Sequence, residues 1–256
     1  MPDHGLEQAI RAAGGVSELA RKIGISQPSV SKWVRVPAER VLAVEAATGV
    51  ERAILRPDLY GRLKGQLDEV ESGRAQEYAL LAVLLARAPD RALLERIARL
   101  RGDATPLGGA HAALAGAAAA ADSDKLEREY FELFIGVGRS ELLPYASYYL
   151  TGFLNERPLA RLRADLRELG IERVEDQPEP EDHAGILCEI MAELIGGEAA
   201  EPLERQRQFF EKHLAPWIGR FFADLETAKA AGFYRHVGTV GRLFIDIENE
   251  AFALSE

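Results

Sequence analysis

The spacing of hydrophobic residues along the chain is helical almost throughout. After Pro158, leucines recur every three or four residues up to Leu169, and Gly170 follows as a stop signal. A second apolar stripe runs from Leu126 to Phe134, behind Asp124 as a plausible N-cap. Further helices are expected at about 75–88, 90–101, 110–121, 180–195, 201–214, 215–230 and 236–253. Because no stretch alternates as a strand would, the pattern predicts an all-α fold.

The pattern also changes along the chain. Residues 1–60 form a set of short helical stretches, whereas residues 75–256 contain longer and more apolar ones. Between them, residues 61–74 are polar and rich in glycine, which is typical of a short helix or of a flexible linker. The sequence therefore predicts a small domain at 1–60, a linker at 61–74 and a larger helical domain at 75–256.

Charge separates the same two parts. The chain of 256 residues has 31 Lys and Arg against 41 Asp and Glu, a net charge of −10. Residues 1–60 hold eight of these basic and seven of these acidic residues, so nearly all the negative charge belongs to the remainder. An acidic body repels a phosphate backbone, so any contact with nucleic acid is expected from the N-terminal part.

Cysteine content and hydropathy indicate the compartment. The single cysteine, Cys188, excludes an internal disulfide and a cysteine-based metal site, and it suits a reducing cytoplasm. The N-terminus lacks the features of a secretory signal, and the longest weakly polar run, 110–121, is too short to span a bilayer. We therefore expect a soluble, cytoplasmic protein that does not insert into the membrane.

Two helices joined by a tight glycine turn are expected in the N-terminal part. The first presents an apolar face made by Val16, Leu19, Ala20 and Ile23, and Gly24 ends it. The second, at about 27–34, is expected to turn Val30, Trp33 and Val34 inward. Its outward face then carries Gln27, Ser31, Lys32 and Arg35. This is the layout of a helix-turn-helix, whose second helix fits a major groove.

Over about residues 6–60 the sequence resembles the Cro/YdaS-like helix-turn-helix repressors. The resemblance implies DNA binding, with Gln27 and Ser31 at base edges and Lys32 and Arg35 at phosphates. A module that contacts protein or mediates dimerisation is the alternative, because its net charge of +1 is small for a DNA-binding domain.

The second part contains the run Glu179-Pro180-Glu181-Asp182-His183, which we expect at the start of a helix. On a helical wheel, His183 falls at the centre of an apolar face. The other members of that face are Ile186, Leu187, Ile190, Met191 and Leu194. Asp182, Glu189 and Glu193 line up along its flank. This pattern predicts a histidine toward an apolar surface beside an acidic stripe.

With this run, the segments 129–134 (EYFELF), 144–149 (PYASYY) and 209–217 (FFEKHLAPW) make residues 75–256 resemble the TorD/DmsD family of redox-enzyme maturation chaperones. The resemblance implies a cytoplasmic helical bundle that binds the twin-arginine signal peptide, or the apo form, of a molybdenum-cofactor oxidoreductase. Such a chaperone assists cofactor insertion and delays export. By family position the peptide site comprises Tyr145, Ala146, Ser147, Pro180, Asp182 and His183. The wheel adds Glu189 and Glu193.

Structural roles and other functions stay open at this point. An Asp-His pair after a proline is also typical of a helix cap, and Glu189 and Glu193 are also typical of a solvated face. A transcription regulator whose acidic domain senses a peptide or small ligand is the alternative function. We expect no catalysis, cofactor or metal, because the chain has no HExxH, complete dinucleotide fingerprint or Walker A motif. A homodimer fits both resemblances.

Overall fold

A computed structural model describes residues 3–57, 69–138, 140–171, 178–197 and 200–254. Within these ranges the chain is helical, without a strand, which confirms the all-α prediction. It divides into two compact units, residues 1–67 and 68–256. Of the expected linker, residues 61–68 lie outside the described residues, and residues 69–74 already belong to a helix.

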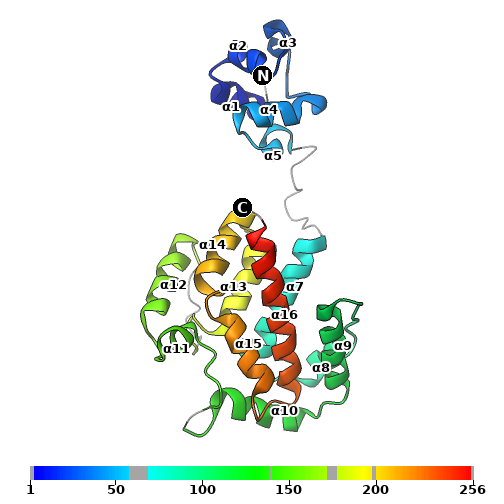
Figure 1. Cartoon of the computed structure of the whole chain (residues 1–256), viewed down its shortest axis with the longest axis vertical. Helices are drawn as coiled ribbons and strands as arrows, with labels where there is room; N and C mark the ends of the chain where they lie inside the picture. The colour runs from blue at the N-terminus through cyan, green and yellow to red at the C-terminus, as the bar shows by residue number, and fades with distance from the viewer. Residues whose placement is uncertain (1–2, 58–68, 139, 172–177, 198–199, 255–256) are drawn as a thin grey trace. The chain divides into compact units, whose positions relative to one another are not determined.

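The first unit packs short helices around a small apolar core (Figure 1). Its helices are α1 His4–Ala13, α2 Val16–Lys22, α3 Gln27–Ser31, the 3₁₀ turn η1 Ala38–Arg40, α4 Val41–Thr48 and α5 Arg52–Leu55. Leu6, Leu19, Val41 and Leu55 are fully or almost fully buried. These residues come from four different helices, so the core fixes their arrangement.

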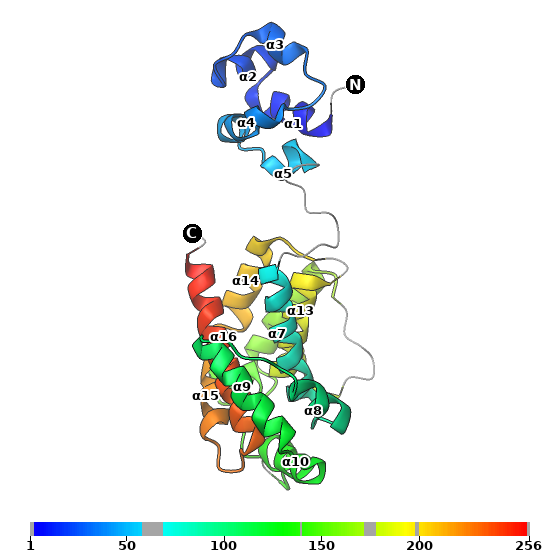
Figure 2. The same ribbon diagram turned by 90° about the vertical axis from the view of Figure 1, so that its right-hand side faces the viewer.

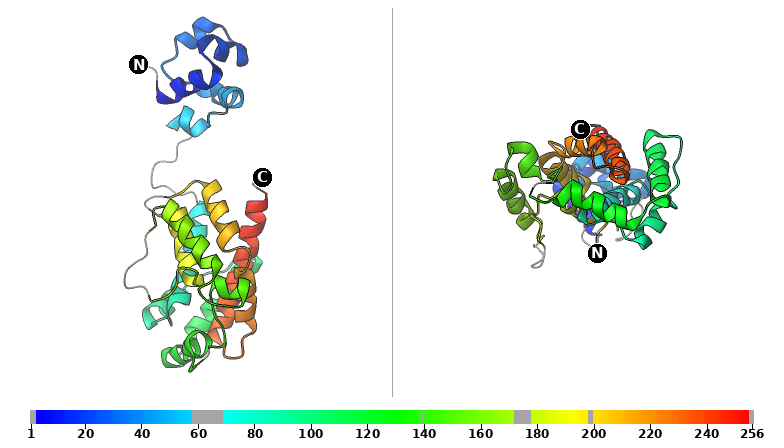
Figure 3. Two further views of the ribbon diagram at one scale, coloured as in Figure 1. Left: turned by 90° about the vertical axis from the view of Figure 1, so that its left-hand side faces the viewer. Right: turned by 90° about the horizontal axis from the view of Figure 1, so that it is seen from below.

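The second unit is built from longer helices. They are α7 Glu69–Ala86, α8 Arg91–Ile97, α9 Pro106–Ala119, α10 Ser123–Tyr130, α11 Ala146–Thr151, α12 Arg157–Glu168, α13 Ala184–Gly196, α14 Leu203–His213, α15 Ile218–Thr227 and α16 Phe233–Ala253. A π-helical turn, η2 Phe131–Ile135, continues α10. α8 and α9 lie on one side of the unit and α11 and α12 on the other (Figures 1 and 3).

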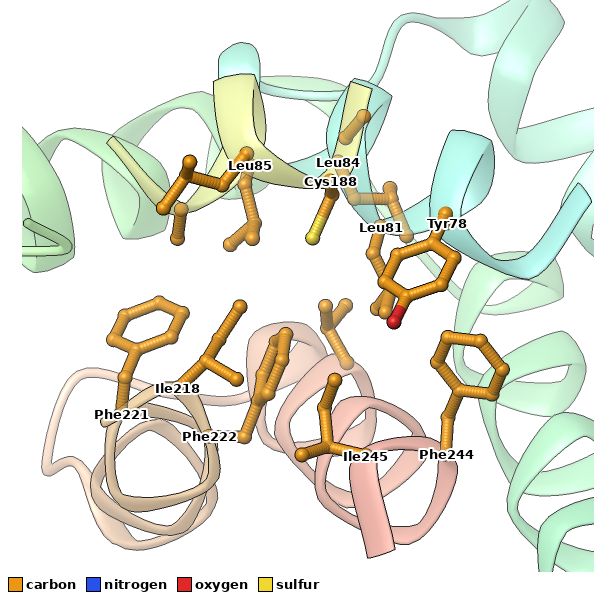
Figure 4. Packing of buried hydrophobic residues seen from close by; sticks show 14 of the residues in the cluster. Tyr78, Leu81, Leu84, Leu85, Cys188, Ile218, Phe221, Phe222, Phe244 and Ile245 are labelled. Atoms are coloured by element: carbon orange, nitrogen blue, oxygen red, sulfur yellow. The ribbon is translucent and has the colours of Figure 1, made fainter. Parts of the chain in front are cut away.

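The core of this unit lies between two pairs of helices. α7 packs along α13, and α15 packs along α16 (Figure 2). Tyr78, Leu81 and Leu84 of α7 face Phe222 of α15 and Phe244 of α16 across the core (Figure 4). Cys188 of α13 is fully buried in this layer, and burial raises the pKa of its thiol, so it is an inert core residue.

Two features hold α16 in place. A Cβ added at Gly241 would lie 2.4 Å from ring carbons of Phe222, so glycine is what allows α15 and α16 to approach so closely. Near the other end of α16, Glu248 is buried and accepts hydrogen bonds from Arg74 at 2.7 and 2.8 Å and from Tyr78 at 3.0 Å. The charge of this carboxylate is thus satisfied inside the core.

Candidate functional site

Two segments that are far apart in the sequence meet at one place in the second unit. The residues before α11 pair with the residues before α13 through an isolated antiparallel bridge between Tyr145 and His183. The Ala146 N–H donates to the Asp182 carbonyl at 3.0 Å, and the Ala184 N–H donates to the Pro144 carbonyl at 2.8 Å. The two helix starts are therefore fixed to each other by backbone hydrogen bonds.

Asp182 strengthens this junction with its side chain. Its carboxylate accepts from the Ser147 N–H at 2.8 Å and from the Ser147 hydroxyl. Asp182 is 1% exposed and Ser147 is fully buried. Tyr145 is the N-cap residue of α11, but its side chain makes no capping hydrogen bond. The carboxylate of Asp182, 35 residues downstream of Ser147, accepts a backbone N–H of the first turn instead.

His183 is the N-cap of α13. Its Nδ1 accepts from the Gly185 N–H at 3.1 Å, and its ring meets the Tyr145 ring edge-on at 5.2 Å. The side chain is buried, and burial lowers its pKa to about 4. His183 is therefore neutral at pH 7 and acts as a hydrogen-bond acceptor at the helix start.

The outer part of the junction is formed by residues that remain partly accessible. The Tyr145 hydroxyl donates to the Glu179 carboxylate, and both residues are half-buried. Burial and then the Glu179 charge raise the pKa of Tyr145. Pro180 is half-buried beside them, and Glu181 pairs with Arg163 of α12 at 2.8 Å. We call Pro144–Ser147 and Glu179–His183 together the helix-start junction.

The predicted acidic stripe is wrong. α13 begins at Ala184 rather than near residue 180, so the helical wheel does not apply to Asp182, which lies in the turn before the helix. Asp182 is buried, whereas Glu189 and Glu193 are exposed on α13. The structure brings Tyr145, Ala146, Ser147, Pro180, Asp182 and His183 together and leaves Glu189 and Glu193 outside this cluster, where a binding role stays a prediction.

A small recess opens beside the junction. Its volume is about 90 Å³, and its lining comes from α11, α12, α13, α14 and the turn before α13: Ala146, Leu150, Pro158, Arg161, Leu162, Asp182, Leu187, Lys212 and His213. A larger hollow of about 540 Å³ between α12 and α14 shares Lys212 and His213 with it. Asp165 lies 2.6 Å from both of these side chains. Basic residues thus border the recess, which nothing in the sequence pattern indicated.

In the first unit, the second helix is shorter than expected. α3 ends at Ser31 instead of Val34, and Val34 is 69% exposed rather than turned inward. Val36 is fully buried instead, because the chain leaves the helix after Lys32. The four predicted DNA-contacting residues, Gln27, Ser31, Lys32 and Arg35, are all exposed. The Gln27 amide donates to the Ser31 hydroxyl at 2.9 Å.

Comparison with known proteins gives a match in each unit. Residues 100–223 match the family described as nitrate reductase delta subunit, and residues 6–64 match the family described as bacterial toxin YdaS. The chain is 28% identical over 139 residues to chaperone protein TorD of Vibrio atlanticus, which covers 50% of this chain and 65% of that protein. After these similarities we call the second unit TorD-like and the first YdaS-like.

Two further similar proteins were found. Chaperone protein TorD of Vibrio cholerae El Tor is 28% identical over 130 residues, 47% of this chain and 59% of that protein. A solved structure from Archaeoglobus fulgidus, described as a redox enzyme maturation protein, aligns with 72% of this chain and 98% of its own at 21% identity and a TM-score of 0.46. The chain spans about six tenths of the length of the curated relatives that it matches.

The segment EYFELF of the TorD-like unit has a structural role that the sequence did not show. The Glu129 carboxylate accepts from the backbone N–H groups of Gly232, Phe233 and Tyr234 at 2.8 to 3.2 Å and so caps the start of α16. Tyr130 packs against Tyr234 with ring centroids 5.8 Å apart. Sequence reasoning missed this cap because the partners are more than 100 residues apart.

Two other properties bear on function. Among the residues that the structure describes, no three His, Cys, Asp or Glu side chains gather as they would around a metal ion. No helix in the same ranges has both the length and the apolar composition needed to cross a bilayer.

Proposed function

We propose that the TorD-like unit is a cytoplasmic chaperone for a molybdenum-cofactor oxidoreductase. It binds the twin-arginine signal peptide, or the apo form, of that enzyme, assists cofactor insertion and delays export. The similarity to proteins named chaperone protein TorD supports this proposal. The observation that carries it is the helix-start junction, where two segments of the family resemblance, 144–149 and 179–183, are joined into one rigid feature.

The junction divides the proposed binding residues by role. Ser147, Asp182 and His183 are buried and engaged with each other or with the backbone, so they act by positioning the segment around them. Tyr145 and Pro180 are half-buried and remain able to contact a peptide. An aromatic side chain next to a carboxylate complements a peptide that carries arginines followed by an apolar run.

Calorimetry with two synthetic peptides tests the proposal. One peptide carries two adjacent arginines followed by an apolar run of leucine and alanine, and the other has glutamines in place of the arginines. We expect the full chain to bind the first peptide and to bind the second at least tenfold more weakly. The variant Asp182→Ala should bind the arginine peptide more weakly than the unmodified chain does, because it removes the carboxylate that holds the first turn of α11. No binding of the arginine peptide, or equal binding of both peptides, would contradict the proposed function.

The YdaS-like unit favours DNA binding as a second function. Its two helices α2 and α3 are joined by a turn at Gly24, where φ is +71°. The four polar residues on and after α3 are exposed together. Lysine and arginine at phosphates would provide the affinity, and the short α3 would present Gln27 and Ser31 to base edges.

Titration of labelled DNA from the region upstream of the gene tests this function. We expect salt-dependent binding, and Lys32→Gln should lower the dependence of log K on log salt by about 1, the change expected for one phosphate contact. Arg11→Gln removes the same charge from α1 and should leave the slope unchanged. A flat salt dependence, or equal effects of the two substitutions, would argue against the assignment. The titration is then repeated in the presence of the arginine peptide. A change in DNA affinity indicates a regulator that senses a peptide, whereas an unchanged affinity indicates that the two units act separately.

A further inference from the structure

The outward side of α10 and η2 combines carboxylates with exposed apolar side chains. We call Asp124, Glu127, Arg128, Phe131, Glu132 and Ile135 the α10–η2 face. Positions 124, 127, 128, 131, 132 and 135 follow the helical repeat, while Leu126 and Leu133 on the opposite side are buried in the core. The same helix that helps to build the core therefore presents a second, solvent-facing stripe.

The face and the residues that follow it expose large apolar side chains. Phe131 is 40% exposed, Ile135 56% and the following Val137 93%. Asp124, Glu127, Arg128, Phe131 and Glu132 line a shallow hollow of about 410 Å³. Phe131 lines this hollow, and Ile135 and Val137 follow it along the chain. Exposed apolar side chains gathered in this way are typical of a contact surface.

The carboxylates of the face are available for a cationic partner. Asp124, Glu127 and Glu132 are exposed, and within the described ranges no Lys or Arg side chain forms an ion pair with them. Glu129, in the same segment, differs because it caps α16. With Arg128 included, the residues that line the hollow carry a net charge of −2.

Other acidic and apolar places fit a cationic peptide less well. Glu189 and Glu193 are exposed but line none of the hollows described above. The recess beside the junction has a volume of only about 90 Å³ and is bordered by Arg161, whose charge repels arginine. On the α10–η2 face, exposed carboxylates without an ion pair among the described residues adjoin exposed apolar side chains.

From these observations we propose that the α10–η2 face holds the signal peptide, with the two arginines at Asp124, Glu127 and Glu132 and the apolar run on Phe131, Ile135 and Val137. This inference rests on the proposed chaperone function. It assigns the acidic subsite to residues outside the peptide site that family position implies and outside the stripe expected from the helical wheel.

Two double variants with equal charge change test the assignment. Glu127→Gln/Glu132→Gln alters the α10–η2 face, and Glu189→Gln/Glu193→Gln alters α13; all four side chains are exposed, so both proteins should fold. Binding of the fluorescein-labelled arginine peptide to the full chain is measured by anisotropy at low and high salt. We expect the first variant to bind about two- to tenfold more weakly at low salt, the second to bind as the unmodified chain does, and the difference to vanish near 1 M salt.

A third variant tests the apolar strip. Phe131→Ser/Ile135→Ser should weaken binding at every salt concentration, because the lost contact is not electrostatic. Binding that is unaffected by the α10–η2 substitutions, or reduced equally by both charge variants, overturns the inference and leaves the chaperone function intact. No binding of the arginine peptide to the unmodified chain overturns the chaperone function and the inference together.

Discussion

Acidification should destabilise the TorD-like unit through His183. This side chain is 5% exposed, and its Nδ1 accepts the Gly185 N–H at the start of α13. Protonation of that nitrogen would remove the acceptor and place a charge in the interior. Burial therefore holds the pKa of His183 at about 4 in the folded chain, against 6.5 for an ordinary histidine.

The sign and size of the effect follow from this difference. Between pH 6.5 and about 4 the unfolded chain binds a proton at this position and the folded chain does not, so the free energy of unfolding falls as pH falls. Each pKa unit corresponds to about 1.4 kcal/mol, so His183 should lower the stability by about 2–3 kcal/mol between pH 7.5 and pH 4.5. Below pH 4 its contribution should level off.

Urea unfolding followed by tryptophan fluorescence measures this effect. Trp217 is buried in the TorD-like unit, so a Trp33→Phe background makes it the only reporter. His183→Asn is the reference variant, because asparagine accepts the same N-cap hydrogen bond and does not titrate. His213, whose pKa is also lowered, and His111, whose pKa is raised, are present in both proteins, so their effects cancel in the difference.

We expect the free energy of unfolding of the protein with His183 to fall by about 2–3 kcal/mol relative to that of His183→Asn as pH falls from 7.5 to 4.5. A difference that stays constant across this range would show that His183 is protonated equally in both states. The buried, neutral N-cap described above would then be incorrect.

Two further predictions concern the core. Arg74→Met should lower the free energy of unfolding by about 3–5 kcal/mol, because it leaves the buried carboxylate of Glu248 without its cation. Adding Glu248→Gln to this variant should restore part of the lost stability. Urea unfolding measures both effects. Gly241→Ala should lower the free energy of unfolding by about 1–3 kcal/mol and lower Tm, because the new Cβ meets the Phe222 ring. Gly219→Ala is the control and should be tolerated, because its Cβ would lie 3.9 Å from its nearest neighbour. Equal Tm values for the two variants would contradict this prediction.

Sequence periodicity located most of the second unit. The leucines at 159, 162 and 166 are buried on α12 as their spacing predicted, Pro158 lies in the first turn of that helix, and Gly170 follows its C-cap. Helix ends were less predictable. α13 begins four residues later than expected, because the Asp182 carboxylate serves α11 and His183 takes the N-cap. In the first unit, α3 stops three residues early, and Val36 occupies the core position expected for Val34.

Sequence by itself determined the helical class and the change in charge between the two parts, because these depend on local spacing and composition. The resemblance to a known family singled out Tyr145 to Ser147 and Pro180 to His183, but it did not show that these two segments pair with each other. Only the tertiary structure decided which of those residues are buried and which face solvent. Ser147 and Asp182, or Glu129 and the start of α16, interact across 35 and more than 100 residues. A helical wheel describes one helix at a time. It therefore cannot show that one carboxylate caps the start of a distant helix while other carboxylates are exposed at the surface.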